Sequence, residues 1–242
     1  MLRIGMLTPS SNTVLEPVSA RLVAGLDQVS LHVSRFEVTK IGLDPAALGQ
    51  FDDAPILEAA RLLAHAKVDV IAWNGTSASW LGLDRDRALV ERIETATGIP
   101  AATCMLGFFD LFRALDVRRL GLVTPYTADV QAQIATTYAA EGVTVTAERH
   151  LGIRDNFTFG TVAPADIAAM ITAVASERPD AVAIVCTNMN GARVAADLEA
   201  RLGLPVLDSV AVTLHACLSR VGADPAMVTG WGQLFATRIS AA

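Results

Sequence analysis

The chain has 242 residues, of which 52% are hydrophobic and 18% charged, and its formal net charge is −6. This composition is typical of a globular protein with a sizeable apolar core, and it excludes a disordered or fibrous chain. Because nucleic acids are bound through clustered lysines and arginines, the negative charge and the scattered basic residues argue against a nucleic-acid partner.

The first segment, residues 1–9, is a short apolar strand that ends at a proline. It lacks the long apolar run and cleavage site of a signal peptide, and no stretch approaches the ~18–20 apolar residues that span a bilayer. The chain contains three widely spaced cysteines, which predict neither a disulfide framework nor a zinc site. We therefore expect a cytoplasmic protein without a membrane partner or a metal.

Apolar runs alternate with helical patterns along the whole chain, which indicates an α/β fold with mainly parallel sheets. Three short segments of the first half return in the same order in the second half: 3–10 at 119–126, 69–76 at 180–187, and 98–100 at 203–205. Such a duplication predicts two similar lobes related by a pseudo-two-fold axis, each a four-stranded sheet flanked by helices.

Each lobe is expected to alternate strands and helices. The predicted strands lie near 3–8, 30–36, 68–73 and 100–103 in the first lobe, and near 119–124, 143–147, 180–185 and 205–208 in the second. Ser11 or Asn12 can cap a helix through 15–24, and Pro164 suits a first helical turn.

The last part of the chain is expected to return to the first lobe. The segment after Asp208 is predicted to be helical to about Val221, and a glycine-rich stretch, 230–235, should pack back on the first lobe. The predicted division is therefore a first lobe of residues 1–115 completed by 209–242, and a second lobe of residues 116–208.

Ligands of open parallel sheets bind beyond the carboxyl ends of the strands. The segments in that position are 9–13, 75–77, 125–127 and 186–190. If the lobes face each other, all four segments line one cleft, and Gly75 and Cys186 occupy equivalent places on opposite walls.

These segments are rich in neutral hydrogen-bonding side chains beside a single thiol. They are Ser10, Ser11, Asn12, Thr13, Thr76, Ser77, Ser79, Tyr126, Thr127, Cys186, Thr187 and Asn188. Together with loop amides at helix N-termini, such donors suit a carboxylate or a developing oxyanion. Any one of them could equally be a helix cap or a turn residue. Their recurrence at equivalent points of both repeats favours a binding site.

Cys186 is the predicted catalytic group. A lone cysteine at a strand end is often only a small hydrophobe. A thiol directed at a helix N-terminus, however, has a lowered pKa and can exchange protons near neutrality, which is what we expect of Cys186. Cys104 and Cys217 lie in apolar helical contexts and are predicted to be core residues. The chain has no G-x-G-x-x-G, Walker or G-x-S-x-G motif, so we expect no cofactor.

Three segments resemble the Asp/Glu racemase superfamily, specifically its maleate cis-trans isomerase and arylmalonate decarboxylase branch. They are residues 8–13 (Thr-Pro-Ser-Ser-Asn-Thr) with Glu16, residues 124–126 (Thr-Pro-Tyr), and residues 154–156 (Arg-Asp-Asn). The resemblance covers essentially the whole chain. It implies that Asn12, Tyr126 and Asn156 hold a substrate carboxylate.

The resemblance divides between the two activities of that branch. Racemases and maleate isomerases of the superfamily carry one cysteine in each lobe, whereas this chain has Gly75 in the first. Glycine at this place, followed by Thr76, Ser77 and Trp80, resembles the arylmalonate decarboxylases, which keep only the second cysteine. The loop 10–13 is similar to the isomerases.

We therefore expect cofactor-free decarboxylation of a substituted (aryl)malonate to a chiral monocarboxylic acid, with Cys186 as proton donor. The expected substrate-binding and oxyanion residues are Asn12, Gly75, Thr76, Ser77, Tyr126, Asn156 and Thr187. The alternatives are a maleate isomerase-like or racemase-like enzyme acting on a small dicarboxylate or amino-acid derivative, and a non-catalytic carboxylate-binding protein. A homo-oligomer is compatible with the sequence. With one acid–base group the product should be a single enantiomer, and a cysteine at position 75 should restore the missing partner.

Overall fold

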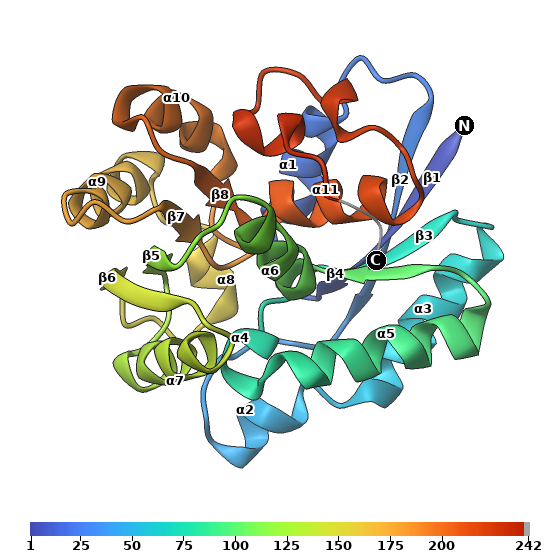
Figure 1. Ribbon diagram of the computed structural model, residues 1–242. Helices are drawn as coiled ribbons and strands as arrows, with labels where there is room; N and C mark the ends of the chain where they lie inside the picture. Colours follow the sequence, from blue (N-terminus) through green and yellow to red (C-terminus); the bar gives the residue numbers. More distant parts are fainter. Residues whose placement is uncertain (240–242) are drawn as a thin grey trace.

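The computed structural model describes residues 1–239, and within them the chain forms two four-stranded parallel sheets (Figure 1). The strand order is β2-β1-β3-β4 in the first sheet and β6-β5-β7-β8 in the second, so one topology occurs twice. The strands of the first sheet are β1 (Leu2–Pro9), β2 (Val29–Phe36), β3 (Val70–Trp73) and β4 (Ala101–Thr103). Those of the second are β5 (Arg119–Thr124), β6 (Thr144–His150), β7 (Ala181–Ile184) and β8 (Val206–Asp208). The predicted duplicated α/β fold is confirmed.

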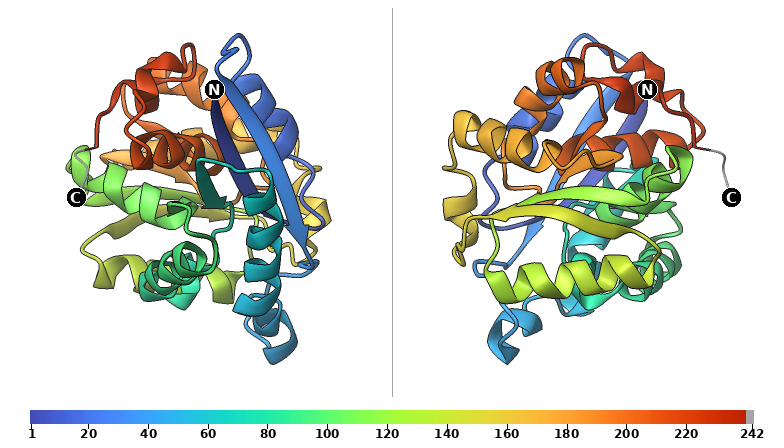
Figure 2. Two further views of the ribbon diagram at one scale, coloured as in Figure 1. Left: turned by 90° about the vertical axis from the view of Figure 1, so that its right-hand side faces the viewer. Right: turned by 60° about the vertical axis from the view of Figure 1, so that its left-hand side comes forward.

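Helices cover both faces of each sheet. In the first half they are α1 (Leu15–Leu22), α2 (Pro45–Gly49), α3 (Asp53–His65), α4 (Ala78–Leu81), α5 (Leu83–Thr97) and α6 (Cys104–Ala114). In the second half they are α7 (Ala128–Ala140), α8 (Asn156–Phe159), α9 (Pro164–Ala175), α10 (Ala192–Leu202) and α11 (Ser209–Arg220), followed by the short 3-10 turns η1 (Pro225–Met227) and η2 (Gln233–Ala236). The right-hand view of Figure 2 shows α7 and α9 on opposite sides of β6.

The inner strands explain why the sheets need helices on both faces. All four residues of β3 and all four of β7 are buried. A strand covered on both sides presents apolar side chains in both directions, and therefore reads in the sequence as a continuous apolar run rather than an alternating one. Both strands are accordingly predicted at the right place from the sequence.

The duplication extends to the way the last helix of each copy begins. Thr103 ends β4, and its hydroxyl accepts a hydrogen bond from the amide of Leu106 in α6. Asp208 ends β8, and its carboxylate accepts from the amides of Val210 and Ala211 in α11. A side-chain oxygen at the N-cap satisfies helix amides that have no partner within the helix.

The helix after the second sheet packs on the first. Helix α11 contacts α1, α6, β3 and β4. The turn η2 lies on α11, while the amide of Gln233 donates to the carboxylate of Glu199 in α10 at 2.9 Å. The glycine-rich stretch therefore touches the second half as well. The last three residues of the predicted segment 209–242 lie outside the described part, and the lobe boundaries remain a prediction. Within residues 1–239, no helix is both long and apolar enough to cross a bilayer.

Candidate active site

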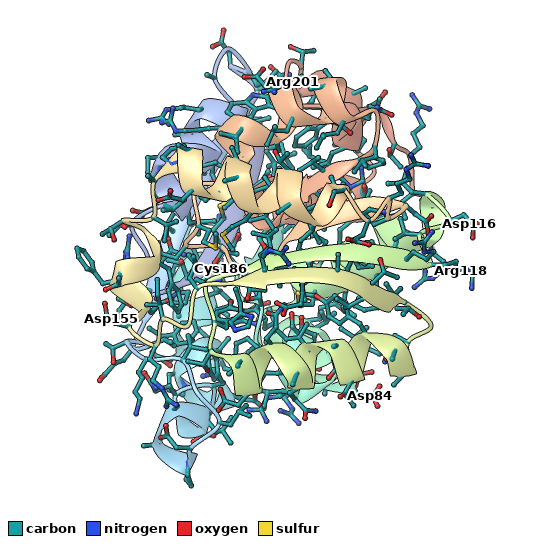
Figure 3. The ribbon with its side chains drawn as sticks, turned by 90° about the vertical axis from the view of Figure 1, so that its left-hand side faces the viewer. Asp84, Asp116, Arg118, Asp155, Cys186 and Arg201 are labelled. Atoms are coloured by element: carbon teal, nitrogen blue, oxygen red, sulfur yellow. The ribbon has the colours of Figure 1, made fainter. Side chains whose placement is uncertain are left out.

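A narrow pocket lies between the two lobes, where the carboxyl ends of the inner strands meet. It is lined by Pro9, Ile41, Phe51, Trp73, Gly75, Thr76, Ser77, Trp80, Tyr126, Asn156, Cys186 and Thr187. Seven of the eight predicted site residues are therefore brought together, and Asn12 is the exception. Figure 3 shows Cys186 inside the molecule, in contrast to Asp84, Asp116 and Arg201 at its surface.

Cys186 lies in the turn that joins β7 to α10. Its amide donates to the hydroxyl of Ser209 at 3.0 Å, and that hydroxyl donates to the carbonyl of Ile184 at 2.8 Å. The amide of Asn188 donates to the Cys186 sulfur at 3.4 Å. The thiol thus accepts from a backbone amide of the turn that precedes α10, whereas the sequence predicts contact with amides of the helix N-terminus.

The predicted lowering of the Cys186 pKa is wrong. Burial raises the pKa of this thiol to about 12, although the amide of Asn188 and the hydroxyl of Tyr126 lower it in part. Because only 3% of Cys186 is exposed, the thiolate loses more solvation than these two donors replace. A thiol with such a pKa is protonated at neutral pH.

The hydroxyls of Thr76 and Tyr126 share a hydrogen bond of 2.6 Å that connects the two lobes. The Tyr126 ring packs edge-on against Trp80 and Phe159, with centroid distances of 5.3 and 5.6 Å. Burial raises the pKa of Tyr126 well above its usual value. This wall of the pocket is therefore neutral and carries hydroxyl donors at fixed positions.

Asn12 lies one layer behind the pocket. Its side-chain oxygen accepts from the amides of Val14 and Leu15, so it serves the start of α1, as its predicted capping role requires. Its side-chain amide donates to the hydroxyl of Thr187 at 3.2 Å, and Thr187 donates to the carbonyl of Asn74 at 3.0 Å. Asn12 therefore positions Thr187, and its direct contact with a substrate remains a prediction.

Asn156 and Asn188 connect the helical turn α8 with the first lobe. The side-chain amide of Asn156 donates to the Ser11 hydroxyl at 2.7 Å. Asn188 accepts from the amides of Thr13 and Val14 at 2.9 and 3.2 Å, and donates to the carbonyl of Asn156. The sequence predicts Asn188 as a cleft residue without a role; the structure makes it one of the links between the two halves of the pocket.

Two apolar walls of the pocket come from a segment that carries no functional signal in the sequence. Ile41 and Phe51 belong to residues 37–52, between β2 and α3. This segment reaches the second lobe: the amide of Ile41 donates to the carbonyl of Arg154 at 2.9 Å, and the carbonyl of Thr39 accepts from the amide of Asn156 at 3.0 Å. Backbone contacts of this kind leave no residue pattern from which they could be predicted.

The sequence predicts Trp73 only as the apolar end of a strand, yet it lines the pocket. A Cβ atom built on Gly75 would overlap the Cζ2, Cε2 and Cη2 atoms of the Trp73 indole. The expectation that a cysteine at position 75 restores a second thiol stays a prediction, and it requires the indole to move, because the ring already fills that space.

The residues lining the pocket carry hydroxyl, amide, indole and thiol groups, and none of them is charged. Such a site would meet an anionic substrate with oriented dipoles instead of cations. Its donor set does not suit a metal ion, and within residues 1–239 no three His, Cys, Asp or Glu side chains form a group that could hold one. The buried carboxyl of Asp208 influences Cys186 from outside the pocket and raises the thiol pKa further.

Comparison with known proteins points to two activities. A family model described as arylmalonate decarboxylase matches residues 4–235. Arylmalonate decarboxylase from Bordetella bronchiseptica is 28% identical to this chain, covering 96% of it and 95% of that protein. Maleate isomerase from Pseudomonas putida is 27% identical, covering 96% of each.

Solved structures give the same pair. The maleate isomerase Iso from Pseudomonas putida S16 is similar with a TM-score of 0.88 at 25% identity, covering 97% of this chain and 98% of that one. A structure of arylmalonate decarboxylase is similar with a TM-score of 0.77 at 26% identity, covering 97% and 99%. Overall likeness does not select between the two reactions, so the choice depends on the residues of the pocket.

Proposed function

Because the chain belongs to the arylmalonate decarboxylase family, we propose that it decarboxylates a substituted malonate without a cofactor, and that Cys186 is its only proton donor. The family model describes decarboxylases, and the relatives include maleate isomerases. Which of the two reactions this chain catalyses is therefore the subject of the proposal. The observation that carries it is the pairing of Cys186 with a glycine: position 75 lines the same pocket and brings no acid or base.

In the proposed reaction, hydroxyl donors hold one carboxylate of the malonate. Thr76, Ser77 and Tyr126 are neutral and lie together on the pocket wall. When the bond between the α-carbon and the other carboxylate breaks, CO₂ leaves and its bonding electrons spread into the retained carboxylate as an enediolate. Donors already in place stabilise that developing charge at no reorganisation cost.

The departing carboxylate would face the apolar side of the pocket. Ile41, Phe51 and Trp80 form this side and offer a carboxylate no charged partner. Poor solvation of the group that is lost favours its conversion to neutral CO₂.

The last step returns a proton to the α-carbon. A general acid has to be protonated when it acts, and the buried Cys186 thiol meets this condition at neutral pH. Its proton goes to the carbanionic carbon from one side only, and solvent then reprotonates the thiolate. The net change is the loss of CO₂ and the gain of one proton, and where the α-carbon carries two different substituents the product is one enantiomer of a monocarboxylic acid.

Maleate isomerisation is the second candidate, favoured by the maleate isomerase relatives and by the loop 10–13. It requires a nucleophile to add to the double bond while a second group manages the proton. Gly75 cannot supply either group, which makes isomerisation the weaker proposal.

The decisive experiment incubates the protein with methylmalonate, phenylmalonate and maleate in D₂O, with EDTA present and no added cofactor. Decarboxylation gives CO₂ and an α-deuterated monocarboxylate in the NMR spectrum. Isomerisation gives fumarate without CO₂. Binding by calorimetry without turnover of any compound would favour the non-catalytic alternative and overturn the proposal.

A further inference from the structure

The side chain that closes the first-lobe half of the pocket is Trp73. It ends β3, is 1% exposed, and packs its ring against Phe36 with a centroid distance of 5.2 Å. Its benzene ring takes the space that any side chain at position 75 would need. Gly75 and Trp73 therefore depend on each other: the indole of Trp73 fits only because residue 75 has no side chain.

The second lobe has the same pair of positions, but there the first residue is smaller and the second carries a side chain. Ile184 and Cys186 correspond to Trp73 and Gly75 in the internal repeat. The Cδ1 atom of Ile184 lies 2.6 Å from the point where a Cβ on Gly191 would be, so this side chain is directed to the start of α10. Cys186 consequently has room in the pocket. Two positions before the glycine the first copy thus has a large residue, whereas two positions before the thiol the second copy has a smaller one.

We propose that Trp73 is a specificity-determining residue, which limits the pocket to a single thiol and to malonates whose α-substituent is small. The substrate part of this inference rests on the proposed decarboxylation. Little free space remains between Trp73, Trp80 and Phe51, and the indole of Trp73 is the ring that abuts position 75. In a closely packed apolar pocket, one extra methylene changes kcat/KM by about 10–200-fold. A phenyl group exceeds a methyl group by much more than one methylene, so we expect phenylmalonate to be a far poorer substrate than methylmalonate.

The steric part is tested without substrate, through melting temperatures of four proteins: wild type, Trp73→Ile, Gly75→Cys and the double variant. Isoleucine gives the first lobe the residue that lies two positions before the thiol in the second lobe, Ile184. Gly75→Cys in the wild-type background should lower the Tm by roughly 3–10 °C, because it overfills the core. The same change in the Trp73→Ile background should cost less than half as much. An equal loss in both backgrounds would overturn the inference. If Trp73→Ile does not fold, Trp73→Phe shortens the ring system and gives the same comparison.

The substrate part is tested with methylmalonate and phenylmalonate. In Trp73→Ile the ratio of kcat/KM for phenylmalonate to that for methylmalonate should rise by at least about 10-fold. Trp231→Ile is the matched control, since Trp231 lies outside the pocket, and its ratio should stay at the wild-type value. An active enzyme whose ratio does not respond to Trp73→Ile contradicts the inference. If wild type decarboxylates no malonate, the proposed function fails and the substrate part falls with it, while the melting temperatures still decide the steric part.

Discussion

The hydroxyl of Tyr126 lies 2.6 Å from that of Thr76, and this hydrogen bond closes the pocket across the two lobes. Each hydroxyl has one hydrogen, so only one of the two donates within the pair, and the Tyr126 hydroxyl also interacts with the Cys186 thiol. Under the proposed function, a carboxylate would meet hydroxyl groups that these contacts already hold in place. This pair is the structural basis for expecting charge stabilisation at the pocket wall.

Tyr126→Phe removes the hydroxyl and keeps the ring. Losing one hydrogen bond to a charged oxygen costs about 1.5–3 kcal/mol, so a non-reactive dicarboxylate should bind roughly ten- to a hundred-fold more weakly by calorimetry. Tyr138→Phe is the matched control, because this buried hydroxyl contacts Ser79 at 3.3 Å and does not line the pocket. Equal affinities of Tyr126→Phe and wild type would mean that the carboxylate binds elsewhere.

Cys186→Ala should abolish turnover of the active malonate while dicarboxylate binding persists. A positioned general acid contributes about 10²–10⁴-fold to a rate, and among the described residues the pocket lining contains no other thiol and no imidazole or carboxyl group. Cys217→Ala, at a buried thiol in α11 away from the pocket, should retain activity. Both are measured as CO₂ release with purified protein whose circular dichroism matches wild type. Residual activity above a few per cent in Cys186→Ala would exclude the thiol as the sole proton donor.

The sequence predicts the fold well because its signals are local. Both inner strands are continuous apolar runs, and the repeated segments mark the same strand ends in each half, so the topology and the meeting of Gly75 with Cys186 at one pocket follow from the pattern. The cytoplasmic location and the oligomeric state remain predictions.

What the sequence does not reveal depends on contacts between distant segments. Burial of Cys186 is a property of the closed pocket, and it reverses the pKa shift that a helix start alone predicts. The overlap of the Trp73 ring with the space above Gly75 depends on a side-chain conformation, which no spacing encodes. The sequence predicts Asn12 both as a cap and as a ligand; its two hydrogen-bonding ends are occupied by α1 and Thr187.

The buried Asp86 should make the free energy of unfolding fall as pH rises. Desolvation raises its carboxyl pKa from 3.8 to about 7, more than the Thr103 hydroxyl and Arg85 lower it. The folded state therefore holds a proton that the unfolded chain releases. This contribution is complete below pH 4 and is lost as pH rises to about 7, and it amounts to roughly 4 kcal/mol at 1.36 kcal/mol per pKa unit.

Asp86→Asn removes this titration, so urea unfolding should show the variant more stable than wild type at pH 8 but not at pH 4. Asp84→Asn, at an exposed position of the same helix, should follow the wild-type curve within about 0.5 kcal/mol. Asp208, whose carboxyl pKa burial also raises to about 7, adds a fall in the same direction and leaves a slope in the variant. Parallel pH curves for wild type and Asp86→Asn would contradict the assignment.

Asn188→Ala should weaken the connection between the lobes and lower activity without touching the thiol. Its side-chain oxygen accepts from the amides of Thr13 and Val14, and its amide group donates to the carbonyl of Asn156, so alanine leaves buried groups on both lobes without a partner. Each such loss costs about 1–3 kcal/mol, which should appear in urea unfolding. We expect the loop 10–13 and Asn156 to shift when this link is lost, so that KM should rise several-fold and kcat should fall less. Asn190→Ala is the matched control two residues along, since the Asn190 side-chain oxygen has no hydrogen-bond partner among the described residues, and it should change stability by less than about 1 kcal/mol. If Asn188→Ala and Asn190→Ala behave alike in both unfolding and KM, the lobes are held together by other contacts, and the role assigned to Asn188 is wrong.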